Sequence, residues 1–370
     1  MAQQHLDPTD PTAGAVTGDA LAGYLRAQAT EFLRALRLHR ETGGQAAGAA
    51  EPVDAARALR RSARRISASL HTFRPLLDPD WSEEMRPELA WLSGTLGLEH
   101  ACEARLERLL LALHRLSGAT VLPAQAVDVA VAAGGRATEA ARAGTAAVQS
   151  TGGPAHATAT TERGTLTVGA AKAGALLERQ LTLARTRAHS TALQALGSSR
   201  FHAVADKVAV LASEVPLTPA ASATALHPLA AAAEERLTDA VAALPLVTAG
   251  HPYNAEALVH GLSPDPAPHP QDSPWHQVRL LLRLHRYARE VLHGGDAPVD
   301  VRLLTAGQAL NRHRDASEAA AAAAQAARTP RITPATAYAL GVLHADQRHE
   351  VEAARFAFQQ AWLKQTVPAP

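Results

Sequence analysis

The chain has 370 residues, of which 47% are hydrophobic and 19% charged, so it can bury the core of one large domain or two small ones. Lys and Arg total 36 against 35 for Asp and Glu, and this net charge of +1 lacks the general basicity of a nucleic-acid-binding protein. The one cysteine, Cys102, cannot form an internal disulfide. No apolar run is long enough to span a bilayer and the first 15 residues lack the features of a secretory signal, so we expect a cytoplasmic protein that does not enter a membrane.

Alanine dominates the apolar part of the composition, as in the run Ala319–Ala324, while aromatic residues make up only 4%. Alanine is the best helix former, and a chain built on it favours packed helices over a sheet. We therefore predict an all-α fold.

The first part of the chain predicts a disordered tail followed by five helices. Residues 1–16 are polar and form the tail, and Leu21, Leu25 and Phe32 recur at helical spacing behind it. Helices are expected over residues 19–40, 52–73, 82–113, 166–196 and 200–212. The segment 119–163 is rich in Ala, Gly and Thr and poor in large apolar residues, so we predict a mobile low-complexity insertion there.

The second part of the chain predicts four more helices beyond a joint near Pro216. They are expected over residues 226–244, 275–292, 299–327 and 334–364. Both parts thus carry similar elements in a similar order, which suggests an internal duplication. We predict two pseudo-symmetric helical bundles, a first half over residues 17–215 that contains the insertion and a second half over residues 220–365.

The second helix of each half carries basic residues at a spacing of three and four. In the first half they are Arg57, Arg60 and Arg64, and in the second half they are His276, Arg279, Arg283 and Arg286. Aligning Arg57 with His276 brings the two rows into the same register, with Ser67 standing where the second row has Arg286. This spacing places each row on one face of its helix, where a buried seam would normally carry leucine.

A row of like charges without carboxylates repels itself, so it needs an anion or an acidic partner. A phosphate chain supplies repeated negative charge, and guanidinium groups can grip its oxygens with two nitrogens at once. The alternative is that each row is a solvated helix face whose arginines extend into water. Two rows in matched register favour the binding hypothesis.

At these residues the chain resembles the CHAD family, the conserved histidine α-helical domain. The family motif looks like H-x-x-R-x-x-x-[KR]-x-x-R, which the second row matches throughout. Downstream, the segment LNRHRDA with His313 resembles a second family segment, and HTFRPLLDPDW and the C-terminal YALGVLHADQRHE are also family-like. The resemblance covers about residues 17–365. It departs from the motif at Arg57, where the family has His, at Ser67, where it has Arg, and at Asn311, where it has Gly.

The resemblance implies a helical fold around a basic groove that binds inorganic polyphosphate without hydrolysing it, in the cytoplasm and in association with polyphosphate granules. The residues it implies as ligands are Arg57, Arg60, Arg64, His276, Arg279, Arg283, Arg286 and His313. No catalytic set, cofactor motif or metal-binding spacing is found among the 18 histidines and the carboxylates, so we expect neither an enzyme nor a metalloprotein.

Two other functions remain open. The departures at Arg57 and Ser67 fit a drifted member of the family that serves as a helical scaffold for a protein partner. Nucleic acid is disfavoured, because few aromatic side chains are available for stacking on single strands and the near-neutral charge does not suit duplex binding.

Overall fold

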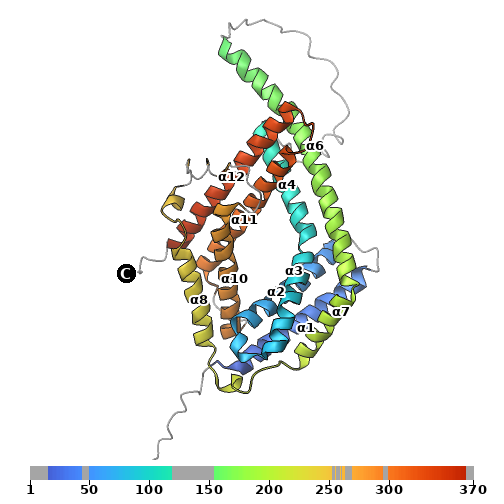
Figure 1. Ribbon diagram of the computed structural model, residues 1–370, viewed down its shortest axis with the longest axis vertical. Helices are drawn as coiled ribbons and strands as arrows, with labels where there is room; N and C mark the ends of the chain where they lie inside the picture. The colour runs from blue at the N-terminus through green and yellow to red at the C-terminus, as the bar shows by residue number, and fades with distance from the viewer. Residues whose placement is uncertain are drawn as a thin grey trace, which may run out of the picture.

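The computed structural model shows that every regular element in the described part of the chain is a helix (Figure 1). It describes residues 16–43, 50–118, 154–251, 255, 259, 261–262, 269–294 and 299–363. Within these ranges, pairing of extended backbone is limited to one isolated antiparallel bridge between Leu77 and Leu217. The all-α prediction is therefore confirmed. No helix among these residues is long and apolar enough to cross a membrane.

In the part of the chain that the structure describes, six long helices precede residue 215. They are α1 (Gly18–Gly43), α2 (Ala50–Thr72), α3 (Pro79–Thr95), α4 (Leu98–Ser117), α6 (Pro154–Leu196) and α7 (Ser199–Ser213). Four follow it: α8 (His227–Ala242), α10 (Ser273–His293), α11 (Val301–Ala327) and α12 (Pro334–Leu363). Short 3-10 turns connect some of them, including η5 (Pro270–Asp272), which leads directly into α10.

The prediction of one long third helix over residues 82–113 is wrong. The chain forms two helices there, α3 and α4, which are separated by Leu96 and Gly97. The side chain of Asp78 caps α3 by accepting a hydrogen bond from the Trp81 amide at 2.8 Å. At Gly97 a Cβ atom would lie only 2.7 Å from the Arg60 Nε, and closer still to the rest of that guanidinium, so the glycine makes room for an arginine of another helix.

The predicted insertion at residues 119–163 is only partly described. Residues 119–153 lie outside the described residues. Residues 154–163 belong to α6, which begins at Pro154 rather than near residue 166. The tail predicted for residues 1–16 also lies outside the described residues, except for Val16.

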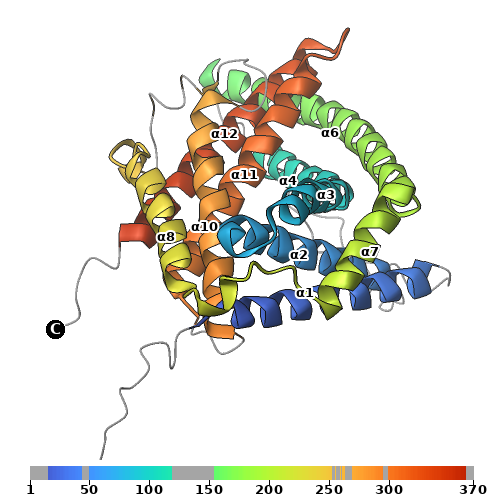
Figure 2. The same cartoon turned by 60° about the horizontal axis from the view of Figure 1, so that its bottom comes forward.

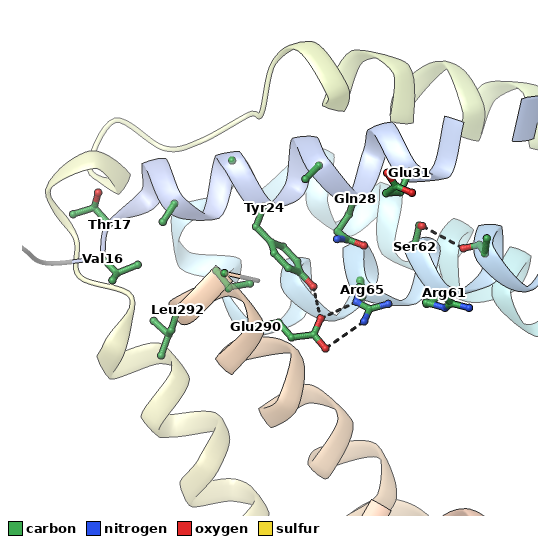
Figure 3. Close-up of a pocket in the computed structure, with 16 residues that line it drawn as sticks. Val16, Thr17, Tyr24, Gln28, Glu31, Arg61, Ser62, Arg65, Glu290 and Leu292 are labelled. Atoms are coloured by element: carbon green, nitrogen blue, oxygen red, sulfur yellow. Dashed lines mark hydrogen bonds and ion pairs between the residues drawn. The ribbon is translucent and has the colours of Figure 1, made fainter. Parts of the chain in front are cut away.

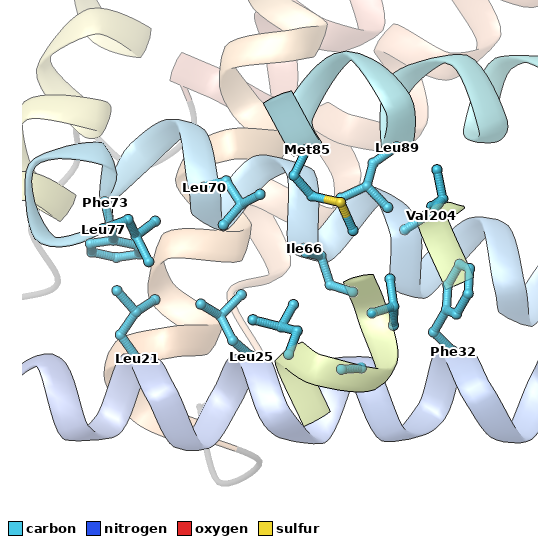
Figure 4. Close-up of a cluster of buried hydrophobic side chains, with 14 of the residues drawn as sticks. Leu21, Leu25, Phe32, Ile66, Leu70, Phe73, Leu77, Met85, Leu89 and Val204 are labelled. Atoms are coloured by element: carbon cyan, nitrogen blue, oxygen red, sulfur yellow. The ribbon is translucent and has the colours of Figure 1, made fainter. Parts of the chain in front are cut away.

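The largest hydrophobic core lies among α1, α2, α3 and α7, and it also receives the end of α10 (Figure 4). Phe32, Ile66 and Phe73 are fully buried in it, and Ala288 and Val291 carry α10 onto the same core. Since α2 and α10 are the helices that bear the two basic rows, this shared core fixes one row relative to the other.

Of two further cores, the first combines helices from both sides of residue 215 and the second lies among the helices that follow it. One joins α4 and α6 to α11 and α12, with Leu113 and Leu340 among its members. The other joins α8, α10, α11 and α12 around Trp275 and Phe358. Figures 1 and 2 both show α4 and α6 beside α11 and α12. The division into halves at 17–215 and 220–365 and the internal duplication stay predictions, and the packing shows that α4 and α6 share their core with the C-terminal helices.

Candidate functional site

The first basic row lies on α2 against α3, and its two inner arginines are anchored there. Arg60 donates a hydrogen bond from Nε to the Ser93 carbonyl oxygen at 3.1 Å. Arg64 donates from Nε to the Ser93 hydroxyl at 2.9 Å. Both side chains are partly buried. Ser93 of α3 therefore anchors two arginines of α2, each through its Nε atom.

The second row repeats this anchoring on another pair of helices. Arg279 on α10 donates from Nε to the side-chain oxygen of Asn311 on α11 at 2.8 Å. In Arg60, Arg64 and Arg279 alike, the anchor uses Nε and leaves the two terminal nitrogens for another partner. Those two nitrogens form the fork with which an arginine holds two oxygens of one phosphate or carboxylate.

The inner arginines form no ion pair with a carboxylate of the described residues. Among the described residues, no carboxylate lies within ion-pair distance of the following four, which we call the arginine cluster: Arg60, Arg64, Arg279 and Arg283. Burial, followed by the charges of Arg60 and Arg283, lowers the pKa of Arg64 to about 10. Burial, followed by the charge of Arg283, lowers the pKa of Arg279 to about 9. Arg64 and Arg279 therefore stay charged at neutral pH.

The two rows act on each other, which was predicted from their matched register. The charge of Arg283 on α10 lowers the pKa of Arg60 and Arg64 on α2, and the charge of Arg64 lowers that of Arg279. In each case burial is the larger cause. The structure therefore brings the inner residues of both rows into one cationic cluster.

The outer predicted residues lie differently. Arg57 is exposed, and its terminal nitrogens lie 3.3 Å from an oxygen of Asp54 and 3.5 Å from the Nδ1 of His100. These contacts are with α2 and α4 and not with the other predicted ligands. Arg286 is exposed at the other end, where its charge contributes to lowering the pKa of Arg283. Arg57 has an acidic partner that the inner arginines lack.

The two predicted histidines contact each other, one half-buried and the other buried in the interior. The His276 ring lies 5.5 Å from the His313 ring in an edge-on arrangement, and His313 stacks on Trp275 at 5.6 Å. His276 is half-buried, whereas the His313 side chain is 1% exposed. Burial lowers the pKa of His313 to about 4 and also lowers the pKa of His276, so both rings are neutral at pH 7. His313 therefore lies beneath the site, and in this structure its ring has almost no surface through which to touch a ligand.

His313 belongs to a buried ionic network around Asp272, which the sequence analysis did not find. Asp272 is fully buried and accepts hydrogen bonds from Arg348 at 2.7 Å and from Arg355 at 2.7 Å. Ser317 donates to the same carboxylate at 2.7 Å. Burial alone would raise the pKa of Asp272, but its contacts with His313 and Arg348 hold that pKa well below its usual range.

An ion pair joins α2 and α10, the two helices that carry the basic rows, at the far end of those rows. Arg65 on α2 donates from Nε to Glu290 on α10 at 2.7 Å, and the Tyr24 hydroxyl on α1 donates to the same oxygen at 3.0 Å (Figure 3). These groups line a cavity of about 950 Å³. Burial and the charge of Glu290 raise the pKa of Tyr24, which keeps its hydroxyl protonated as a donor. The three helices are thus joined through one carboxylate.

Arg314 on α11 also acts on the arginine cluster, although it belongs to neither row. Its charge contributes to lowering the pKa of Arg60, Arg64, Arg279 and Arg283. The sequence analysis quoted it within LNRHRDA but did not select it. Among the described residues, no group of three or more His, Cys, Asp or Glu side chains is placed to hold a metal ion.

Comparison with known proteins identifies a family and similar solved structures. A family model described as the CHAD domain matches residues 27–299. The structure is similar to that of PptA from Streptomyces chartreusis, with 69% sequence identity and a TM-score of 0.72 over 94% of this chain and 99% of that chain. It is also similar to the crystal structure of the CHAD domain from the plant Ricinus communis, with 16% identity and a TM-score of 0.44 over 96% of this chain and 95% of that chain. No curated protein matches the chain.

Proposed function

The chain belongs to the CHAD domain family, and on that premise we propose that its arginine cluster binds inorganic polyphosphate without hydrolysing it. The observation that carries the proposal is the anchoring of Arg60, Arg64 and Arg279 by Nε alone. Each of these guanidinium groups keeps its two-nitrogen fork for an oxyanion, and none has a carboxylate partner among the described residues.

The energetics favour a multivalent anion over a single small one. The four cations of the cluster come from α2 and α10 and repel one another, as the lowered pKa values of Arg64 and Arg279 indicate. A linear phosphate chain carries a charge on every unit, so one molecule can neutralise several arginines at once. Each further contact after the first is intramolecular and costs less entropy.

Nucleic acid carries a phosphate backbone too, but two features disfavour it. Base stacking needs aromatic platforms, and the aromatic residues nearest to the second row, Trp275 and Tyr287, are buried or half-buried. The overall charge of +1 supplies little long-range attraction for a duplex. The competing hypothesis, a helical scaffold for a protein partner, rests on the departures at Arg57 and Ser67. Arg57 is paired with Asp54 and contacts His100, so this departure leaves the arginine cluster itself unchanged.

No group in the cluster fits a role in catalysis. Hydrolysis of a phosphate chain needs an activated water or a metal ion, whereas the cluster supplies only donors that bind the ground state. We therefore expect binding without turnover, in the cytoplasm and at polyphosphate granules.

A titration of the full chain tests the proposal. Long-chain polyphosphate is the ligand, and single-stranded and duplex DNA with the same number of phosphates are the controls. We expect tight binding of polyphosphate alone, and an affinity that falls linearly on a logarithmic scale with salt, because each bound arginine releases counterions. Phosphate release should stay at the level of buffer. Absence of polyphosphate binding at low salt would contradict the proposal in favour of the scaffold, and equal binding of DNA would contradict its selectivity.

A further inference from the structure

Arg314 lies on α11, a helix that bears neither basic row, and its charge acts on both rows. Asn311, three residues earlier and hence on the same side of α11, anchors Arg279 of the second row. His313, next to Arg314, contacts His276 of the same row. Across the cluster, the charge of Arg314 acts on Arg60 and Arg64 of the first row. Its side chain is 29% exposed, so solvent and a dissolved ligand can reach it.

Arg314 differs from the four cluster arginines in having acidic partners. Its Nε donates to an oxygen of Asp315 at 2.9 Å, and its Nη2 contacts the same oxygen. Glu318 lies 3.8 Å from the same Nε, but its other oxygen pairs with Arg105 at 2.6 Å. Asp315 is therefore the main counter-ion of Arg314. It is 46% exposed and adjacent in the chain, so its side chain can turn away into water without moving the helix.

We infer that Arg314 is the phosphate-binding residue that links the two rows, and that Asp315 is an internal counter-ion which polyphosphate displaces on binding. The inference rests on the proposed function and adds to it a residue on a third helix and a condition for entry. The carboxylate and a phosphate group compete for the same guanidinium nitrogens, because each presents a pair of negatively charged oxygens that an arginine can hold.

The competition selects for long phosphate chains. Orthophosphate gains one contact and must remove Asp315 at that same contact, so its net gain is small. A chain that is already held by Arg60, Arg64 and Arg279 presents its next phosphate to Arg314 at a high effective concentration. Asp315 therefore weakens the binding of short anions more than that of long ones.

Four variants of the full chain test the inference with long-chain polyphosphate and with orthophosphate as probes. They are Arg314→Gln, Asp315→Asn, the double variant and Arg312→Gln. We expect Arg314→Gln to weaken polyphosphate binding about tenfold, the usual scale for a lost charged hydrogen bond, and to lower the salt slope by about one. Asp315→Asn should tighten orthophosphate binding by a larger factor than polyphosphate binding. Arg312 is exposed and about half a turn from Arg314, so Arg312→Gln should leave both affinities unchanged.

The double variant distinguishes two explanations for the effect of Asp315→Asn: release of the Arg314 guanidinium from its counter-ion, and a simple change of net charge. If Asp315 acts by occupying Arg314, the gain from Asp315→Asn disappears once Arg314 is replaced. An equal gain in both backgrounds would overturn the counter-ion role, and normal polyphosphate binding by Arg314→Gln would overturn the linking role while leaving the proposed function intact. Failure of the wild type to bind polyphosphate would remove both. Circular dichroism of each variant excludes a loss of helix as the cause.

Discussion

Two groups of buried or half-buried arginines lie next to each other in this molecule and are treated in opposite ways. Around Asp272, Arg348 and Arg355 are almost fully buried, and each is hydrogen-bonded to the same carboxylate. In the arginine cluster, Arg64 and Arg279 are partly buried and form no ion pair with any carboxylate among the described residues. A paired arginine in the interior is part of what keeps the fold, whereas an unpaired one adds repulsion that an anionic ligand can relieve.

The first way to test this comparison is to remove the shared carboxylate. Asp272→Ala should leave Arg348 and Arg355 buried without a counter-charge, and we expect the free energy of unfolding to fall by about 3–5 kcal/mol. Chemical denaturation measures the loss. Asp239→Ala, at an exposed position of α8, should change it by less than about 0.5 kcal/mol. A small effect at Asp272 would mean that the network does not hold the fold.

Reversing the charge of the unpaired group should instead abolish binding and spare the fold. Arg279→Glu combined with Arg283→Glu places two carboxylates where the phosphates bind, and we expect affinity for polyphosphate to fall at least about 100-fold. The same reversal at Arg26 and Arg37, two exposed positions of α1, should cost far less. Helix content should persist in both double variants. Retained binding by the first of them would place the ligand elsewhere.

The histidine beneath the site should make stability depend on acid. The folded chain keeps His313 neutral down to a pKa of about 4, while the unfolded chain takes up the proton near pH 6.5. Stability from this source is present above pH 6.5 and is lost as the pH falls toward 4, by at most about 1.4 kcal/mol per pH unit. His313→Gln should flatten that slope, and His114→Gln, at an exposed position, should retain it. Parallel slopes for all three proteins would be inconsistent with a buried neutral ring.

The smallest expected effect is a gain in stability. The Arg283 side chain makes no hydrogen bond among the described residues, and burial together with the charges of Arg314 and Arg286 lowers its pKa. Arg283→Met relieves the repulsion and keeps the apolar stem, so without ligand we expect a stabilisation of about 0.5–1 kcal/mol. In thermal unfolding, Arg283→Met should be more stable than the wild type without ligand and less stable than the wild type when polyphosphate is added. Arg187→Met, on the exposed side of α6, is the neutral comparison.

The arrangement of the two rows could be anticipated from the sequence because it depends on helical periodicity. Arg60 and Arg64, like Arg279 and Arg283, recur at a spacing that puts them on one face, and the matched register pointed to one cluster. The anchors could not be anticipated in this way. Ser93 and Asn311 are ordinary polar residues of other helices, and only tertiary packing brings them to the Nε atoms.

The errors have physical causes as well. The helix break at Gly97 was missed because a single glycine is tolerated within a helix, and its reason, the Arg60 guanidinium, comes from 37 positions away in the chain. Arg314 was missed because it belongs to neither basic row and lies on a third helix, which only tertiary packing brings to the other two. His313 was assigned to the ligand because a resemblance transfers a position in a motif but carries no information on burial.

The Nε anchors separate two roles within a single side chain, because Nε bonds to the protein while the two terminal nitrogens are left without a hydrogen bond to the described part of it. Lysine has one nitrogen and cannot do both, even though it carries the same charge. At Arg60, Arg64 and Arg279 a lysine could either keep the hydrogen bond to the neighbouring helix or donate to a phosphate, but not both in the geometry of the arginine. An alignment that scores these three columns simply as basic would therefore count as equivalent two side chains that this scaffold tells apart.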